Sequence, residues 1–217
     1  TNIKYPFHAD GRPAPPELPA DNNPVGSYRH AFTVPAGWNG REIYLRFGAV
    51  SSAFYLWVNG RMVGYNEGSK DPAEWNVTQY VRPGANTLAV EVYRWSSASY
   101  LEDQDFWRLS GITRDVYLYA RPRTHIRDFF ARAALTPDYL DGRLAVDVQL
   151  EGSDRTPRQH TVVGKLWDGD RVIAEQRQVV SVTDTASIRL DAPVARPHLW
   201  SAESPNLYTL TLTLLGP

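Results

Sequence analysis

The 217-residue sequence contains no cysteine, so it has neither disulfide bonds nor thiolate metal sites. This absence fits a reducing cytoplasm, although a periplasmic location stays open. The longest apolar runs fall far short of the roughly 20 residues that a membrane-spanning helix requires, so we expect no membrane. The net charge is only −1, and no long run has one sign, which argues against nucleic acid as a partner.

Helical periodicity is also lacking, because no stretch keeps a 3.6-residue apolar period over three turns. The segment DPAEWNVTQY (71–80) could form at most a short helical turn. The first residues, TNIKYPFHADG, do not resemble a secretory signal, and the last, LTLTLLGP, fall in or just after a strand pattern. We therefore expect an N-terminal piece excised from a longer protein.

Period-two alternation dominates the rest of the chain and predicts β-strands. In AFYLWVNGRMVGY (53–65), Phe54, Leu56 and Val58 fall on one face and Tyr55 and Trp57 on the other. The Asn-Gly dipeptide at 59–60 predicts a tight hairpin turn, because both residues tolerate positive φ. Aromatic residues reach 12% of the sequence, which is typical of a β-sandwich core but also allows sugar-stacking platforms.

The segment ARPRTH (120–125) has the composition of a domain boundary. About seven strand patterns follow it, with turn signals at 141–142 and 168–170, which is typical of a small immunoglobulin-like sandwich. The fold class is therefore predicted as all-β. We expect one β-sandwich domain over residues 1–122 and a second over 123–217.

The stretch SYLEDQDFWRLSGI (99–112) places Glu102, Asp103 and Asp105 within four positions. Two carboxyls of a glycosidase must lie on opposite sides of the scissile bond, which neighbours on one loop seldom do. Carboxylates at this spacing do not form a calcium-loop motif, and the five histidines lack zinc-ligand spacing. Neighbouring arginines could instead neutralise Glu102 and Asp103. From the residues alone, this loop indicates a site but no reaction.

Four blocks of the sequence resemble the β-galactosidases of glycoside hydrolase family 2: NPVGSYR (23–29), VSSAFYLWVNGRMVGYNEGSKDPAEWNVT (50–78), YRWSSASYLEDQDFWRLSGITRDVYLYARP (93–122) and HLWSAESPNLYTLTL (198–212). The resemblance implies a jelly-roll sugar-binding domain followed by an immunoglobulin-like domain. It further implies that a TIM barrel of the same polypeptide, absent from this sequence, holds both catalytic glutamates. No catalytic residue is therefore expected in this chain.

The resemblance also assigns two substrate-binding residues. Asp105 matches a carboxylate that accepts hydrogen bonds from galactose hydroxyls and helps to hold Na⁺, so it is expected as both a substrate and a metal ligand. Ser51 takes the place of a sugar-contacting asparagine, and its shorter hydroxyl leaves a direct contact or a water bridge open. Phe106 and Trp107 are expected to buttress the loop, and Trp200 to anchor the second sandwich. Mg²⁺ is expected only in the barrel, and the chain itself should require no cofactor.

The resemblance implies that the parent protein is a retaining β-galactosidase that cleaves terminal non-reducing β-D-galactosides. This chain would supply part of the galactose subsite and a rigid spacer, and it should be inactive alone. The parent is expected to be a homo-oligomer. Two alternatives stay open, namely a free-standing carbohydrate-binding module or adhesin, and a sister enzyme of the family such as a β-glucuronidase or a β-mannosidase.

Overall fold

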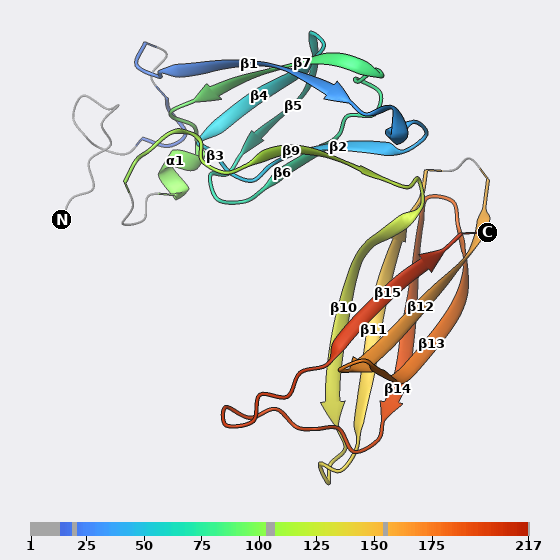
Figure 1. Cartoon of the computed structure of the whole chain (residues 1–217). Coiled ribbons are helices and arrows are strands. Elements are labelled where there is room, and N and C mark those ends of the chain that lie inside the picture. Colours follow the sequence, from blue (N-terminus) through green and yellow to red (C-terminus); the bar gives the residue numbers. More distant parts are fainter. Residues whose placement is uncertain (1–13, 19–20, 103–106, 154–155, 217) are drawn as a thin grey trace, which may run out of the picture. The chain divides into compact units, whose positions relative to one another are not determined.

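The computed structural model describes residues 14–18, 21–102, 107–153 and 156–216. The chain divides into two compact units, Thr1–Arg121 and Pro122–Pro217, next to the boundary predicted after residue 122. Nearly all regular elements are antiparallel strands (Figure 1), which confirms the all-β prediction. Among the described residues, no helix is both long and apolar enough to cross a membrane.

Unit 1 contains two main sheets in two layers (Figure 1). One sheet has the strand order β1-β7-β4-β5 and consists of β1 (Val25–Val34), β7 (Gly84–Tyr93), β4 (Ala53–Val58) and β5 (Arg61–Glu67). The other has the order β6-β2-β9 and consists of β6 (Ala73–Asn76), β2 (Glu42–Phe47) and β9 (Val116–Arg121). A two-stranded sheet pairs β3 (Val50–Ser51) with β8 (Gly111–Ile112). The short helices are η1 (Ala36–Trp38) and α1 (Ala98–Leu101).

The β4–β5 hairpin confirms the prediction from the Asn-Gly dipeptide. Asn59 and Gly60 have φ values of 52° and 77°, as a turn with two positive φ angles requires. The Asn59 side chain also fastens the turn to its neighbours, because its amide donates to the Tyr80 carbonyl oxygen at 2.9 Å and its Oδ1 accepts the Thr87 N–H at 3.0 Å. The turn is therefore joined to β7 as well as to its own strands.

The core of unit 1 contains the inward residues that the alternation predicted. Phe54, Leu56 and Val58 of β4 are at most 1% exposed. The rings of Phe47 and Phe54 lie 4.8 Å apart, and Trp75 packs edge-on against both. Trp75 belongs to β6, which pairs with β2, so residues 73–76 form a strand. The short helical turn that the sequence allowed within residues 71–80 follows this strand, where the Tyr80 and Val81 N–H groups both donate to the Val77 carbonyl oxygen. Tertiary packing decides the conformation of this segment.

Unit 2 has two three-stranded sheets, ordered β10-β11-β14 and β13-β12-β15. Their strands are β10 (His125–Leu135), β11 (Gly142–Glu151), β14 (Thr185–Val194), β13 (Arg171–Val182), β12 (Arg158–Asp168) and β15 (Thr209–Leu215). The core includes Val148, Leu150 and Val162, each at most 1% exposed. The described part of this unit thus has six strands, most of them longer than the seven short strands expected.

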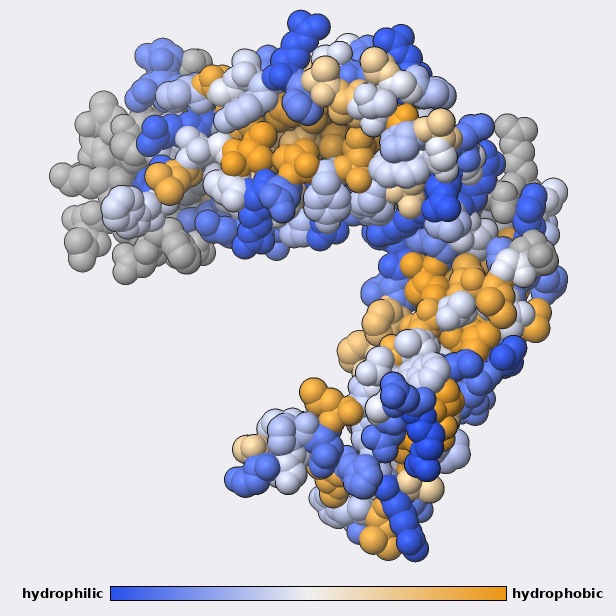
Figure 2. Space-filling model, viewed as in Figure 1, coloured by the Kyte–Doolittle hydropathy of each residue, from blue (hydrophilic) through white to orange (hydrophobic). Residues whose placement is uncertain are grey.

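Trp200 does not anchor the second sandwich, so that expectation is wrong. It lies in the connection between β14 and β15, forms an isolated bridge with Pro205 and is 63% exposed. Figure 2 shows apolar residues on the drawn surface of both units, and in this connection Leu199 and Leu207 are also exposed. Trp200 therefore faces solvent in this chain.

Candidate functional site

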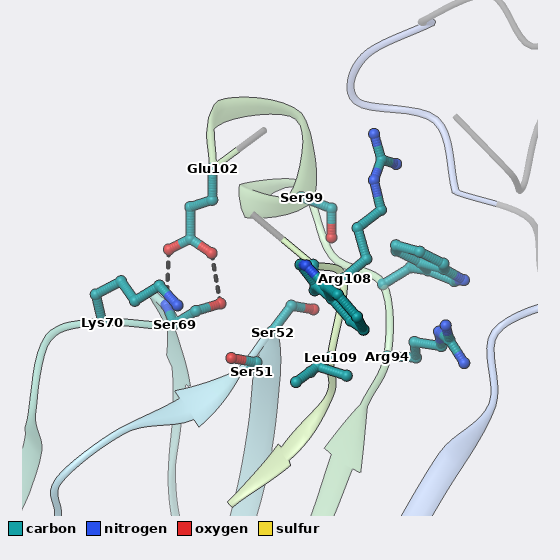
Figure 3. Close-up of a pocket in the computed structure, with 11 residues that line it drawn as sticks. Ser51, Ser52, Ser69, Lys70, Arg94, Ser99, Glu102, Arg108 and Leu109 are labelled. Carbon is teal, nitrogen blue, oxygen red and sulfur yellow. Dashed lines mark hydrogen bonds between the residues drawn. The ribbon is translucent and has the colours of Figure 1, made fainter. Parts of the chain in front are cut away.

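A small hollow of about 70 Å³ opens in unit 1 where several connections between strands meet. Its lining comes from β3, the β5–β6 connection, the end of β7, α1 and the segment before β8 (Figure 3). The lining residues are Ser51, Ser52, Ser69, Lys70, Arg94, Trp95, Ser99, Glu102, Trp107, Arg108 and Leu109. Four hydroxyls, three cationic side chains and one carboxylate make this a polar cavity.

Ser51 lies in this hollow, as a sugar-contacting residue would have to. It ends β3, pairs with Gly111 of β8 and is 9% exposed. The peptide bond to Ser52 is cis. Ser52 is held by its own N–H and hydroxyl, which both donate to the Tyr93 carbonyl oxygen at 3.1 and 3.2 Å. The backbone at Ser51 is therefore fixed between β8 and the end of β7.

Glu102 connects the acidic loop to the β5–β6 connection. Its carboxylate accepts the Ser69 N–H at 2.7 Å and the Ser69 hydroxyl at 2.5 Å (Figure 3). Ser69 is 7% exposed, so these hydrogen bonds are sheltered from water. Both hydrogen bonds go to an ionised acceptor, which makes them stronger than neutral ones. Glu102 is thus held by a serine, whereas Arg94 and Arg108 line the same hollow beside it.

Glu67 holds the other end of α1. This residue ends β5, and its carboxylate accepts the Ser97 hydroxyl at 2.7 Å and the Ala98 N–H at 2.9 Å. Partial burial alone would raise the pKa of Glu67, but these hydrogen bonds outweigh it and hold that pKa below its usual value. Burial and the nearby Glu67 charge raise the pKa of Tyr65 to about 12.

Together, Glu67 and Glu102 form what we call the α1 clamp. Glu67 joins β5 to the start of α1, and Glu102, the residue after α1, returns to Ser69 two positions beyond Glu67. Four hydrogen bonds therefore hold α1 against the end of β5 and the residues that directly follow it. The clamp fixes the position at which the chain enters residues 103–106.

Asp105 and Phe106 lie outside the described residues, so their roles as sugar and Na⁺ ligand and as buttress stay predictions. The residues on both sides of this stretch, Glu102 and Trp107, line the hollow around Ser51. Among the described residues, no group of three or more histidine or carboxylate side chains is placed to hold a metal ion. The Na⁺ expectation therefore depends on Asp105 and on ligands from elsewhere.

Trp107 differs from expectation, because its side chain is 88% exposed and does not buttress the loop from within the core. Leu109, two residues further, is 71% exposed. Both side chains line the hollow, so the hollow has exposed apolar side chains beside its polar ones. An apolar partner surface could pack on these two side chains and close the hollow. The described residues alone enclose about 70 Å³, which is less than a sugar requires.

Sequence reasoning missed Glu67 and Ser69 as parts of this site, whereas Arg94 was among the arginines expected near the acidic loop and does line the hollow. Gly68-Ser69-Lys70 does not resemble a phosphate-binding loop, and its local sequence gives no other sign of a functional role. Arg94 lies over the Trp95 ring at 5.1 Å, and the backbone N–H of Trp95 donates to Asn23 Oδ1 at 2.9 Å. The hydrogen bonds of Ser69 and Trp95 join positions 33 and 72 residues apart, and local sequence patterns carry no signal for them.

Comparison with protein families gives two matches along the chain. Residues 1–122 match the sugar binding domain of glycosyl hydrolases family 2, and residues 124–216 match a second model of glycosyl hydrolases family 2. A β-galactosidase of Priestia megaterium is 46% identical over 99% of this chain, and one of Clostridium acetobutylicum is 42% identical over 96%. The chain spans only about a fifth of these relatives, 21% and 23% of their lengths.

Solved structures have the same fold. A β-glucuronidase 2 of Bacteroides uniformis superimposes with a TM-score of 0.78 and 25% identity, over 88% of this chain and 24% of that one. A putative β-galactosidase from Bacteroides fragilis superimposes with a TM-score of 0.77 at 19% identity, over 88% of this chain and 30% of that one. The two family models together cover nearly every residue, and the chain therefore belongs to glycosyl hydrolases family 2.

Proposed function

We propose that this chain is part of a retaining β-galactosidase and supplies one wall of its galactose subsite. The observation that carries the proposal is the 46% identity to a β-galactosidase over 99% of the chain. Similarity to the β-glucuronidase structure is lower, at 25% identity. The parent protein would act on terminal non-reducing β-D-galactosides, since the higher identity favours this activity over its sister activities.

Asp105 is the proposed sugar ligand. A fixed carboxylate accepts two hydroxyl hydrogens in charge-assisted bonds, and a sugar that lacks the correct hydroxyl leaves this charge unpaired. The α1 clamp supports the proposal because it fixes the chain three residues before Asp105. Ser51 would contribute a hydroxyl from the lining of the hollow, directly or through a water molecule.

The catalytic carboxyls are proposed to belong to a part of the parent that this sequence does not include. A retaining glycosidase requires two carboxyls about 5 Å apart across the glycosidic bond. The hollow around Ser51 has one carboxylate among its lining residues, and Glu102 already accepts two hydrogen bonds from Ser69. The chain would thus bind and orient the sugar, and should not hydrolyse it alone.

Na⁺ is the proposed ion at this wall, with Asp105 as one of its ligands. A hard monovalent cation suits a carboxylate oxygen, and the ion would lie next to the bound galactose. The remaining ligands and any Mg²⁺ would come from the rest of the parent. Measuring kcat/KM of the parent against Na⁺ concentration, with K⁺ replacing Na⁺, would show a dependence that Asp105→Asn abolishes.

The proposal is tested by Asp105→Asn in the full-length parent protein. Loss of a charge-assisted acceptor is expected to lower kcat/KM for nitrophenyl-β-galactoside by about 100-fold. Glu203→Gln, at an exposed position of unit 2, is the matched control and should leave kcat/KM unchanged. If Asp105→Asn and the unsubstituted enzyme have equal kcat/KM, Asp105 does not bind the sugar.

The isolated chain provides the second test. It should not cleave nitrophenyl-β-galactoside, because the proposed catalytic pair is absent from it. Turnover that purifies with the chain and disappears in Asp105→Ala would contradict this separation of binding from catalysis. A complete reading frame that ends at residue 217 would favour a free-standing carbohydrate-binding module.

A further inference from the structure

The outer face of the four-stranded sheet in unit 1 has an aromatic cluster that neither the core nor the hollow around Ser51 uses. Tyr55 of β4 is its centre, with ring centroids of Tyr65, Tyr93 and Trp57 at 4.7, 5.8 and 6.2 Å. Phe54 and its alternating neighbours point into the core, so these four rings point away from it. Tyr65 is 43% exposed, and the other three are partly exposed.

A hollow of about 330 Å³ lies beside this cluster, over β1, β7 and β4. The strand register explains its shape, because Ala89 of β7 pairs with Arg29 of β1 on one side and with Trp57 of β4 on the other. Residues paired across antiparallel strands point to the same face. A small side chain therefore forms the floor between two large ones.

The next row of the sheet supplies a hydrogen-bond acceptor. Glu91 lines the hollow and pairs with Ser27 on one side and Tyr55 on the other. One of its carboxylate oxygens accepts the Tyr93 hydroxyl at 3.3 Å, which leaves further acceptor capacity. Arg29 is exposed and presents guanidinium donors at the opposite wall. The hollow thus has a carboxylate acceptor, a guanidinium donor, the Ser27 hydroxyl and an aromatic wall.

This combination fits one class of ligand. One positive and one negative side chain give the hollow no net charge, so its overall field favours neither anions nor cations. A pyranoside is neutral, has hydroxyls that both donate and accept, and has an apolar C–H face that can lie on an indole ring. A flat aromatic ligand could stack but would leave Glu91 and Arg29 without partners on the ligand.

We propose that this hollow, which we call the Trp57 site, binds a neutral pyranoside. The sugar stacks its C–H face against Trp57, donates a hydroxyl hydrogen to Glu91 and accepts a hydrogen bond from Arg29. The Trp57 site shares no lining residue with the hollow around Ser51. The proposed pyranoside site is therefore separate from the wall of the galactose subsite, and it does not depend on the activity proposed above.

The test titrates the 217-residue chain with methyl β-D-galactoside and methyl β-D-glucoside while the Trp57 indole N–H is followed by NMR. Trp57→Phe assigns that resonance among the seven tryptophans. We expect a saturable shift with a dissociation constant in the millimolar range. Arg29→Ala and Glu91→Gln should each weaken binding about tenfold, because each removes one polar contact to the sugar. Thermal melting of each variant checks that it folds.

Asp105→Asn separates the two surfaces. This variant should leave the Trp57 shift unchanged, whereas a shift that it abolishes would assign the effect to the hollow around Ser51 and overturn the proposal. Absence of a saturable shift at high millimolar sugar would also overturn it. A Trp57 signal that changes with protein concentration and not with sugar would identify a second copy of the chain as the occupant, and would likewise overturn the proposal.

Discussion

Unit 1 and unit 2 both bury apolar strand faces between two sheets, and both have charged pairs between paired strands, such as Arg46 and Glu74 in unit 1. They differ in that two carboxylates of unit 1 also hold a helical turn. In unit 2 the charged residues pair across the outer faces of the sheets, as Lys165 and Glu175 do at 3.3 Å between paired strands. In unit 1 two carboxylates instead hold connections between strands, and both act on α1. These carboxylates of unit 1 therefore position loops, whereas the charged pairs of unit 2 lie on a regular sandwich.

This difference indicates where function can reside. In unit 2 the paired surface charges neutralise one another, which suits the spacer role proposed for this unit. The clamped connections of unit 1 hold Ser69 and Glu102 within one polar hollow, and Ser69 is less than a tenth exposed. Preorganisation of this kind is what a sugar-binding wall requires.

The largest expected effects come from the two cores, where the units should behave alike. Leu56 of unit 1 and Leu150 of unit 2 are 0% and 1% exposed. Replacing either with alanine should cost about 2–5 kcal/mol of unfolding free energy, through lost burial and a residual cavity. Hydrogen exchange followed through urea unfolding would measure each unit separately. A much smaller loss of unfolding free energy in one unit would show that its core relaxes around the cavity. The two cores would then not be equivalent.

The sequence predicted the parts of unit 1 that depend on neighbouring residues. The β4–β5 hairpin follows from alternation around Asn59-Gly60, and both are local signals. The β6 strand was not predicted, because Trp75 adopts it to pack on Phe47 and Phe54, which lie far away in the sequence. Long-range packing overrides local propensity in this segment.

The candidate site was predictable in composition but not in geometry. The acidic loop and Ser51 were identified from the sequence, and the structure places Ser51 beside both flanks of that loop. An arginine was a candidate partner of Glu102, but the hydrogen bonds go to Ser69, 33 residues away. Trp107 and Trp200 were expected to pack inside, but they are 88% and 63% exposed, because an aromatic residue alone does not indicate which side of a loop is covered.

The α1 clamp gives the next prediction. Its counterpart among the described residues of unit 2 is the Asp141 carboxylate, which accepts the Arg196 N–H at 2.9 Å but joins two exposed connections and holds no helix. Glu102→Ala would leave the buried Ser69 N–H and hydroxyl without this acceptor, at a cost of about 1–3 kcal/mol. Amide exchange should accelerate in residues 98–102 and stay constant in unit 2. Glu102→Gln, which keeps one acceptor oxygen, should have an intermediate effect. Unchanged exchange in Glu102→Ala would show that other contacts hold α1.

The pH dependence of the Glu67 end of the clamp sharpens the comparison further. The folded-state pKa of Glu67 is lowered relative to the unfolded chain, so its contribution to stability is present above the unfolded pKa. This contribution is lost as the pH falls through the folded pKa, in the acidic range below neutrality. Glu67→Gln should therefore flatten the decrease in unit 1 stability under acid, as measured by urea midpoints at successive pH values. An unchanged acid profile would exclude Glu67 as its source.

The smallest expected effect belongs to an ion pair on the surface of unit 2. Arg143 donates to both carboxylate oxygens of Asp191, at 2.5 and 2.8 Å, and these bonds hold the pKa of Asp191 below its usual value. The Arg143 side chain is 70% exposed, so water and salt screen the attraction. Arg143→Ala should shift the urea midpoint of unit 2 only marginally, and the shift should vanish at high salt. A large shift that persists in salt would mean that the charged pairs of unit 2 hold its sheets together, as the clamp holds α1 in unit 1.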